Sequence, residues 1–417
     1  MSLPGFATIA RERPDLRLYV ERIERAILGA GPRPALRVKA ISTITSIPES
    51  VVKFVLGRLV SMGDLREQEV SLCARCGIPV SSPDDTGCPY CDTIFSELPP
   101  DKERSMTWEG VVGRDHEFWN STAKQAAIGI VTALPHEASS VLKALNERGE
   151  TACGGVAYDV GLATGVGGVH GIVHTSTNMG NTAAGVVSTR MLGHFPNLQY
   201  LIMVGIAGIV PDPADAAKHA RLGDVVVSNE KGIVEFDLKK EGDGWEEVRC
   251  APTRPGPRLL EAVQRLRRSE VDGSRLEDLP WVTPIAPIAA SLNVTRPADD
   301  TDVLHAAEEP FAVLAHPVDT TRQPGVPRVH LAPIASSGTL LKSPRRRDAL
   351  GREHHVRAVE MEGAGVAEAA WAGQRGYLVI RGGCDYCDQF KNDNWQKYAA
   401  VVAAAYLKAL LRSLAVV

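Results

Sequence analysis

Apolar residues recur at steps of three and four positions through the first 70 residues. This spacing is present in RLYVERIERAILGA (17–30), LRVKAISTITSI (36–47) and PESVVKFVLGRLVSMGDL (48–65), and it predicts short amphipathic helices. Pro48 stands where the last helix should begin, and Gly63 stands where it should end. A charged, β-like stretch follows at residues 65–70. We therefore expect a small α-rich domain over residues 1–70.

A different pattern begins at Ala126, where short, β-rich apolar runs alternate with helical patterns. Nearly continuous apolar strands joined through helices predict a mostly parallel central sheet with helices on both faces. We therefore expect an α/β domain over residues 125–417. The alternating segments are, in order, AIGIVTAL, PHEASSVLKALNER, VHGIVHTS, NTAAGVVSTRMLGHF, YLIMVGIAGIV, GDVVVSNE, VRAVEMEGAGVAEAAWAGQRG, YLVIRGGCD and NWQKYAAVVAAAYLKALLRSL.

Two regions of the chain lack a sustained period. Residues 98–124 are polar and contain two Trp, which indicates a linker that packs in part. Residues 239–328 are rich in Pro and charge, with one helical stretch at GPRLLEAVQRLRRSE. Loops this long usually form lids or insertions, so we expect an insertion in the α/β domain at about residues 239–328.

Four cysteines between these domains form two closely spaced pairs. Cys73 and Cys76 make one CxxC pair, and Cys88 and Cys91 make the second after an eleven-residue gap. Two such turns can complete a tetrahedral zinc site that leaves no open position for water, so the ion should be structural. Residues 71–97 therefore resemble a zinc ribbon. The alternative is a loop with four unpaired thiols.

The N-terminal pattern of two short helices, a tight turn and a β-like tail resembles a winged helix-turn-helix. In that fold the second helix can enter a major groove, where Lys53 and Arg58 would be the reachable cations. Acids and bases are about equally frequent in residues 1–100, whereas DNA-binding modules usually present a basic face. Protein docking or oligomerisation is therefore favoured over DNA binding.

Composition excludes several classes of protein. The 417 residues include 44% hydrophobic and 23% charged positions with a net charge of −4, which is typical of a globular protein and names no partner. The N-terminus shows no apolar core of signal-peptide length, and no run is long enough to span a membrane. Eight cysteines are too few for a disulfide scaffold. We expect a cytoplasmic protein.

Acidic residues follow three of the expected apolar runs. Glu137 follows IGIVTAL, Glu360 and Glu362 follow the run through Val359, and Asp385 follows YLVIRGG. In open α/β sheets the ligand binds beyond the carboxyl ends of the strands. Glycosidic cleavage needs one group to protonate the leaving group and another to activate water. These acids are therefore candidates for such chemistry.

Five ordered motifs give the α/β domain a specific likeness. They are GIVTALPHE, VGIAGIV followed by LGDVVVS, PIASSG, AVEMEGAGVA and VIRGGCD. Residues 125–417 resemble the nucleoside phosphorylase and nucleosidase superfamily, especially the methylthioadenosine/S-adenosylhomocysteine nucleosidases. The resemblance implies a purine nucleoside or nucleotide as substrate, no cofactor for catalysis and a homo-oligomer.

The resemblance also implies roles for individual residues. Asp385 corresponds to the aspartate that protonates N7 of the departing purine, and Glu137 corresponds to the residue that activates water. Glu362 corresponds to the residue that binds the ribose hydroxyls, with Met361 against the sugar. A buried Asp could serve as the acid because desolvation raises the pKa of a carboxyl. The remaining expected substrate contacts are Gly205, Ile206, Ala207, Gly208, Phe236 and Lys342.

Each assignment has a structural alternative. Glu137 could be an acid in the first turn of a helix, Asp385 could cap the segment after its strand, and Glu360 is better explained as a surface or structural acid. Cys384 and Cys387 form a further CxxC around Asp385, with a redox or metal role as the less favoured explanation. No role is assigned to three histidines, His136, His170 and His174.

The motifs favour hydrolysis over phosphorolysis. A phosphate cradle usually includes a serine in the glycine-rich turn and an arginine from an early loop, but Ile206 occupies the serine position and ALPHE contains no arginine. Lys342 and the triplet Arg345 to Arg347 follow PIASSG, so a nucleotide phosphate is a reasonable ligand. The alternative is a solvated basic turn.

An accessory N-terminal region on such an enzyme suggests regulation by a protein or DNA partner. By analogy of architecture, we expect a nucleotide-depleting effector in antiphage defence. The alternatives are a phosphate-dependent purine nucleoside phosphorylase and a DNA-binding regulator that senses a nucleoside.

Overall fold

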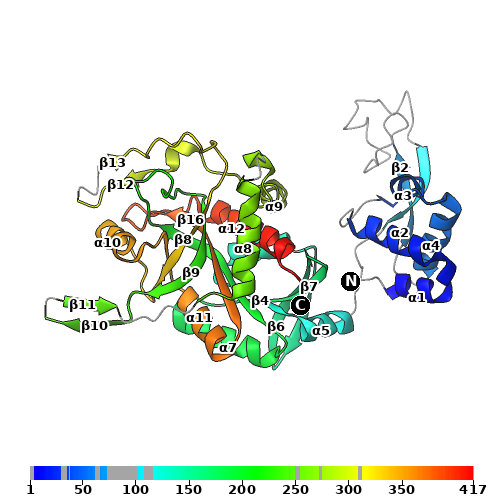
Figure 1. Ribbon diagram of the computed structural model, residues 1–417, viewed down its shortest axis with the longest axis horizontal. Coiled ribbons are helices and arrows are strands. Elements are labelled where there is room, and N and C mark those ends of the chain that lie inside the picture. The colour runs from blue at the N-terminus through cyan, green and yellow to red at the C-terminus, as the bar shows by residue number, and fades with distance from the viewer. Residues whose placement is uncertain are drawn as a thin grey trace. The chain divides into compact units, whose positions relative to one another are not determined.

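The computed structural model describes residues 4–29, 35–36, 38–61, 66–72, 101–107, 116–243, 245–248, 254–271, 275–308 and 312–416. The chain divides into two compact units, Met1–Arg114 and Asp115–Val417. Each is described by itself below, and both are drawn in Figure 1.

The first unit is built from helices around a small apolar core. The amphipathic spacing of its sequence places one buried stripe on each helix. Ser46, with a φ of 54°, makes the turn that ends α3, and α4 begins directly after Pro48 as the sequence predicts. The helices are α1 (Pro4–Glu12), α2 (Arg17–Gly29), α3 (Val38–Thr45) and α4 (Glu49–Ser61), and their core contains Phe6, Ile9, Val20, Ile23, Ile41, Ile47, Val52, Val55, Leu56 and Leu59.

An antiparallel sheet completes the first unit, in the order β1-β3-β2. Its strands are β1 (Ala35–Leu36), β2 (Arg66–Leu72) and β3 (Asp101–Thr107), with Arg66 paired to Thr107 and Leu72 to Asp101. Strand β3 lies within the expected linker, residues 98–124, so part of that segment belongs to this sheet. The winged-helix assignment stays a prediction. Cys73, Cys76, Cys88 and Cys91 lie outside the described residues, and the zinc ribbon stays a prediction as well.

The second unit is organised around a nine-stranded sheet in the order β15-β14-β9-β16-β8-β4-β7-β6-β5. Strand β15 also pairs with β8, which closes five strands into a ring. The strands are β4 (Ile128–Thr132), β5 (Glu147–Cys153), β6 (Val156–Gly165), β7 (Gly168–Ser176), β8 (Tyr200–Ile209), β9 (Val225–Glu235), β14 (Val329–Ser336), β15 (Ala358–Glu360) and β16 (Gly376–Asp385).

The sheet is mixed, which corrects the expectation of a mostly parallel one. Five of its pairings are parallel and four are antiparallel. Continuous apolar runs show that a strand is buried on both faces, but they do not encode its direction. Strands β5 to β7 form a meander, and the glycines in its turns, Gly154, Gly155 and Gly167, adopt positive φ angles. This meander was absent from the sequence prediction.

Helices cover both faces of the sheet (Figure 1). The C-terminal helix α12 (Gln396–Ser413) packs on β8 and β16, and α6 (Pro135–Ala144) packs beside it. On the other face α7 (Asn181–His194) and α11 (Gly363–Ala372) pack together. Helix α5 (His116–Gln125) contacts β5, so the end of the expected linker belongs to this unit. Within the part of the chain that is described, no helix has the length and apolar character needed to cross a bilayer.

The expected insertion, residues 239–328, contains several short elements. The predicted helix is confirmed as α8 (Pro257–Val271), which packs on α12. The other elements are β10 (Lys239–Gly242), β11 (Trp245–Val248), η2 (Leu276–Asp278), α9 (Ile285–Ser291), η3 (Asp299–Thr301), β12 (Leu304–His305) and β13 (Val313–Leu314).

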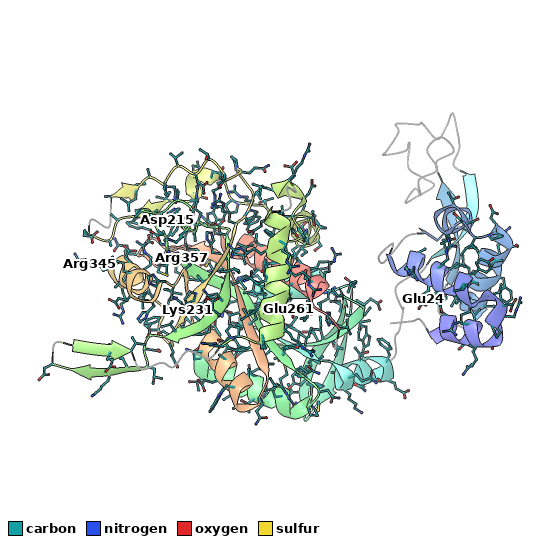
Figure 2. All side chains as sticks on the ribbon, in the orientation of Figure 1. Glu24, Asp215, Lys231, Glu261, Arg345 and Arg357 are labelled. Carbon is teal, nitrogen blue, oxygen red and sulfur yellow. The ribbon has the colours of Figure 1, made fainter. Side chains whose placement is uncertain are left out.

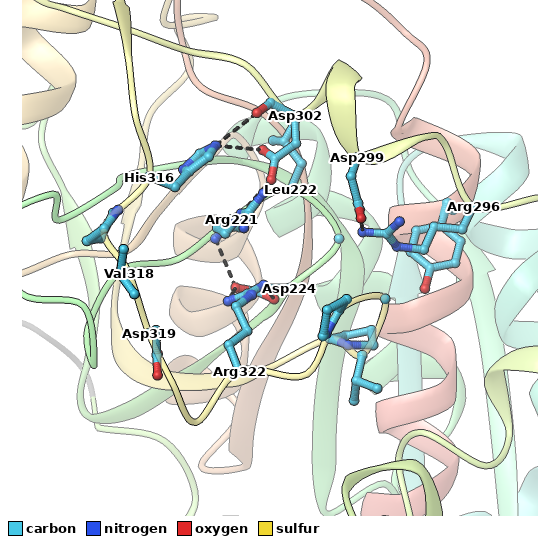
Figure 3. Close-up of a pocket in the computed structure, with 17 residues that line it drawn as sticks. Arg221, Leu222, Asp224, Arg296, Asp299, Asp302, His316, Val318, Asp319 and Arg322 are labelled. Carbon is cyan, nitrogen blue, oxygen red and sulfur yellow. Dashed lines mark hydrogen bonds and ion pairs between the residues drawn. The ribbon is translucent and has the colours of Figure 1, made fainter.

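Buried ion pairs attach the insertion to the sheet. The Arg322 guanidinium donates to both carboxylate oxygens of Asp224, at 2.6 and 3.1 Å, and His330 lies 3.1 Å from the same carboxylate. Burial opposes the charge of Asp224, but His330 and Arg322 outweigh it and hold the pKa of that carboxyl below its ordinary value. These groups lie beside a pocket of about 390 Å³ (Figure 3), in which Arg322 and Asp224 are already paired.

A second anchor joins the insertion to the segment before β9. The Asp302 carboxylate accepts from Arg221 at 2.7 Å and from the Tyr386 hydroxyl at 2.6 Å. His316 lies 2.9 Å from the Asp302 carbonyl and 2.9 Å from His219. The Asp212 N–H donates to Nδ1 of His219, so neutral His219 can donate from Nε2 to His316. Burial and the neighbouring His316 lower the pKa of His219 to about 4.

The low pKa of His219 predicts an acid-sensitive anchor. Because an unfolded His titrates near 6.5, the unfolded chain binds a proton at a higher pH than the native protein does. Stability should therefore fall as the pH decreases from about 6.5 to about 4, with no further loss from this group below that range. His219→Asn should weaken this pH dependence, as measured by urea unfolding at several pH values. The exposed His355→Asn is the control, and an unchanged dependence in His219→Asn would contradict the assignment.

Candidate active site

Strand β8 is the element at which the predicted site residues meet. Strand β16 runs parallel to it and pairs Arg381 with Gly205 and Asp385 with Gly208. Strand β15 runs antiparallel to it and pairs Val359 with Gly208. Two strands that are distant from β8 in the sequence, β15 and β16, therefore place polar side chains along its last half.

Arg381 is the buried cation at the centre of this arrangement. Its side chain is 1% exposed, and its Nη2 donates to Glu360 and, at 3.0 Å, to Glu362. Its Nη1 lies 4.0 Å from a Glu137 oxygen. Burial opposes the charge on Arg381, but the three glutamates outweigh it and raise the pKa of the guanidinium. Arg381 was not among the predicted site residues, although a lone cation in the apolar run YLVIRGG was the available signal.

Glu137 is held by backbone donors and is nearly inaccessible to solvent. Its Oε2 accepts from the N–H groups of Ala133 and Leu134, both at 2.8 Å, and its Oε1 accepts from the Ile206 N–H at 2.8 Å. The first two bonds are those of an acid that caps the N-terminus of α6, so the structural alternative describes part of its role. The third bond places the carboxylate against β8.

Glu362 lies between Arg381 and the N-terminus of α7. Its Oε1 accepts from the Gly180 N–H at 3.1 Å, and its Oε2 accepts from Arg381. Burial raises the pKa of Glu362, against the opposing effect of the Arg381 charge, and the nearby Glu360 raises it further. The adjacent Met361 is half-buried, as a side chain available to a sugar must be.

Glu360 has a structural function. One of its carboxylate oxygens accepts from the N–H groups of Glu362 and Gly363, at 3.0 and 2.7 Å, where α11 begins. These bonds satisfy donors that a helix N-terminus leaves free. The residue is buried, so it is a structural acid of the site and not a surface one.

Asp385 lies farther along β8, beside Gly208. Its Oδ1 accepts from the Cys387 N–H at 2.8 Å, and its Oδ2 accepts from the Lys391 ammonium at 2.6 Å. The Cys384 thiol donates to the same Oδ2 at 3.1 Å. Burial and the Asp385 charge raise the pKa values of both thiols, which keeps them protonated and weakly reactive. This environment does not favour a redox or metal role for the CxxC pair.

A pocket of about 350 Å³ opens beside Asp385 and Lys391. His305 and Phe390 form an aromatic wall there, with stacked rings whose centroids are 4.0 Å apart and whose planes are inclined by 28°. The described residues that line the pocket include Asp385 and Lys391 but not Glu137. The pocket also has a wall from the insertion, which sequence patterns could not assign to a site: Thr301, Val303 and His305.

Two glycines allow the carboxylates to approach β8. A Cβ at Gly205 would overlap the side chains of Glu137 and Arg381, and a Cβ at Gly208 would overlap Cys387 and come within 2.9 Å of Asp385. The Glu137 carboxylate therefore lies against Gly205, and the Asp385 carboxylate lies against Gly208. Three residues of extended strand span about 10 Å. The structure brings both acids to one strand, about that distance apart along it.

The remaining predicted contacts differ in accessibility. Ile206 is half-buried, whereas Ala207 is buried and its carbonyl accepts from the Cys384 thiol at 3.4 Å. Phe236 is buried beneath the Arg346 guanidinium, which lies 5.9 Å from its ring centroid. Lys342 is exposed. Neither Phe236 nor Lys342 lines the pocket beside Asp385, so their role as substrate contacts stays a prediction.

The basic triplet forms the first turn of α10 (Pro344–His354). Arg345 is exposed there (Figure 2). Arg347 is buried and donates to the Tyr386 carbonyl at 2.9 Å and to Asp348. The triplet is therefore not a uniformly solvated turn, because Arg347 is buried and bonds to Tyr386, the residue after Asp385.

Two of the unassigned histidines make internal contacts in the second unit. His174 bonds to Asp159 and Thr132, and His170 lies 3.1 Å from the Leu411 carbonyl. Among the residues that the structure describes, no group of three or more His, Cys, Asp or Glu is arranged to bind a metal ion.

Comparison with known proteins gives relatives for the second unit. The 5′-methylthioadenosine/S-adenosylhomocysteine nucleosidase of Mycobacterium bovis is 23% identical over 291 residues, which cover 69% of this chain and 97% of that protein. A nucleotide-binding leucine-rich repeat (NLR)-like protein of Hyaloscypha variabilis is 29% identical over 302 residues. That match covers 69% of this chain and only 29% of the longer relative.

Solved structures of low sequence identity also align with the second unit. The futalosine hydrolase of Helicobacter pylori aligns with a TM-score of 0.46 at 18% identity, over 69% of this chain and 97% of that one. The nucleosidase of Neisseria meningitidis in complex with methylthio-immucillin-A aligns with a TM-score of 0.48 at 18% identity, over 69% and 99%.

The family assignment rests on a sequence profile. The profile described as the phosphorylase superfamily matches residues 127–413, which contain every strand of the nine-stranded sheet and all the acids discussed above. The match covers more than half of the 417 residues. This chain therefore belongs to the phosphorylase superfamily.

Proposed function

We propose that this chain hydrolyses the N-glycosidic bond of a purine nucleoside or nucleotide. The observation that carries the proposal is the arrangement of buried ionisable groups along residues 205–208, with Glu137, Glu362 and Arg381 at one end and Asp385 at the other. Cleavage of this bond needs a water molecule activated against the sugar and assistance to the departing base. The two ends of the site match these two requirements.

The sugar end suits activation of water. Glu137 accepts three backbone hydrogen bonds that fix its position, and a carboxylate can accept the proton of an attacking water. Glu362, beside it, has an acceptor oxygen for the ribose hydroxyls, and Met361 supplies an apolar contact. The base would then lie toward Asp385 and the aromatic wall of His305 and Phe390.

The charges around the site favour water over phosphate as the nucleophile. Phosphorolysis requires cations and hydroxyls that are available to bind inorganic phosphate. The guanidinium of Arg381 is already occupied by glutamates, and the ammonium of Lys391 is paired with Asp385. Ile206 supplies an apolar side chain where a phosphate cradle would need a hydroxyl.

A purine substrate is supported by the relatives and by the aromatic wall. The M. bovis relative is named for nucleosides of adenine, and we extend that substrate class to this chain as part of the proposal. Nucleotides are included because Lys342 and Arg345 are exposed close to the PIASSG motif, where they are accessible to a phosphate.

We also propose that the first unit regulates the enzyme. A separate compact unit of 114 residues precedes the enzymatic one, and the H. variabilis relative carries an NLR-like name. Both observations support control of nucleotide depletion by a protein or DNA partner, as in antiphage defence. Expression in bacteria followed by chromatography of cellular nucleotides, before and after phage infection, tests this role. Unchanged pools during infection would contradict it.

Release of free base from a defined panel tests the enzymatic proposal. The panel consists of adenosine, methylthioadenosine, S-adenosylhomocysteine, inosine, AMP and ATP, each with and without inorganic phosphate. We expect base release from at least one compound without added phosphate, detected by chromatography. Release only in the presence of phosphate would identify a phosphorylase instead. No release under either condition would count against an enzyme.

Glu137→Gln should remove most hydrolysis while sparing ligand binding. An amide is a poor proton acceptor, so we expect a loss of about 10²-fold or more in kcat with little change in the affinity for a substrate analogue. The amide has one acceptor oxygen for three backbone donors, so stability should also fall by about 1–3 kcal/mol. The exposed Glu230→Gln is the control. Retention of full kcat by Glu137→Gln would exclude the role of Glu137.

Asp385→Asn should impair the departure of the base. General acid assistance is worth about 10²–10⁴-fold, which corresponds to roughly 3–5 kcal/mol of transition-state stabilisation. The amide still offers an acceptor oxygen to Lys391, so the fold should persist. Measurement of kcat against the exposed Asp393→Asn variant checks the effect. A change below about tenfold would be incompatible with this role.

A further inference from the structure

Lys391 is the cation at the base end of the site. Its Nζ lies 2.6 Å from Oδ2 of Asp385, and both side chains line the pocket of about 350 Å³. The Lys391 side chain is 19% exposed, and that of Asp385 is 4% exposed. The pair is therefore largely removed from water yet borders the cavity in which a base would lie.

The contacts of Asp385 conflict with its action as a neutral acid. A proton donor must carry a proton, but all the groups bonded to Asp385 are donors themselves: the Lys391 ammonium, the Cys387 N–H and the Cys384 thiol. In each of these bonds the hydrogen belongs to the partner, and Asp385 supplies only acceptor oxygens. Of these three donors, the Lys391 ammonium is the one that carries a positive charge, and it lines the pocket beside Asp385.

We propose that Lys391 is the proton source for the departing purine and that Asp385 transfers the proton. The inference rests on the proposed function. As the bond between C1′ and N9 breaks, its electron pair passes into the purine and makes N7 basic. N7 takes a proton through Asp385, which takes one from the ammonium of Lys391. Water adds its hydroxide to C1′ and its proton to Glu137, and exchange with solvent restores both residues.

The surroundings of Lys391 keep its ammonium charged until the reaction occurs. Burial opposes that charge, but the neighbouring Asp385 carboxylate outweighs it and raises the pKa of Lys391. Asp388 and His305 line the same pocket. A developing negative charge on the base adds a further acceptor beside the pair, so the proton moves only when the glycosidic bond has weakened.

Two substitutions separate proton supply from a structural role. Lys391→Met removes both charge and proton. Lys391→Arg keeps the charge and the ion pair, but a guanidinium does not give up its proton in a protein. If Lys391 only held Asp385 in place, Lys391→Arg would restore activity. If Lys391 supplies the proton, both variants should lose about 10²-fold or more in kcat.

A substrate that needs no protonation provides the decisive comparison. Adenosine and guanosine would be compared with their 7-methyl derivatives, whose bases already carry a positive charge and leave without a proton. Both variants should lose kcat on the unmethylated nucleosides and stay within about threefold of wild type on the 7-methyl compounds. Activity on the 7-methyl compounds also shows that each variant is folded. The control is Lys218→Met, which removes an exposed Lys–Asp pair of the same 2.6 Å length.

The pH profile of kcat is an independent test. A neutral carboxyl donor would lose its proton, and kcat would fall, as the pH rises through the acidic or neutral range. A lysine donor should keep kcat constant from about pH 6 to about pH 9, because the ammonium titrates above that range. A decrease in kcat within this range would overturn the proposal.

The outcomes distinguish this inference from the proposed function. A wild-type protein that cleaves none of the nucleosides overturns both. Equal impairment of the variants on methylated and unmethylated nucleosides, or full activity of Lys391→Arg on the unmethylated ones, overturns the inference alone. Selective impairment on the unmethylated nucleosides supports it.

Discussion

The pairing of one buried guanidinium with three buried carboxylates determines the geometry of the enzymatic unit. Removal of a charge from water costs several kcal/mol, so Arg381 can be buried only where partners meet it. Those partners come from the β4–α6 turn and the β15–α11 turn, and β8 must pass between them without a side chain at Gly205. A single cation therefore holds three distant segments in register beside Gly205.

The two ends of the site have different electrostatic characters. Near Gly205, carboxylates outnumber the one cation, Arg381, and burial raises the pKa of Glu362. Near Gly208, one carboxylate, Asp385, is matched by one ammonium, Lys391, at 2.6 Å. This difference suits a reaction in which the sugar becomes positive and the base becomes negative as they separate.

The insertion contributes both stability and a wall of the site. Asp224 and Asp302 accept from Arg322 and Arg221, and Tyr386, the residue next to Asp385, bonds to Asp302. The same segment places His305 against Phe390 in the pocket. Residues 301–305 therefore both anchor the insertion and line the pocket beside Asp385.

The sequence by itself determined most helices and strands, because the period of apolar residues reports local geometry, and its motifs located Glu137, Glu362 and Asp385. It missed the β5–β7 meander and the mixed direction of the sheet, since burial on both faces does not encode strand direction. Only the tertiary structure decided the partners of Arg381 and the ion pair between Lys391 and Asp385. Such pairings depend on the distance between two side chains in the folded chain and on their removal from water, which strengthens the interaction between the charges. A linear pattern of residue types carries no information about either.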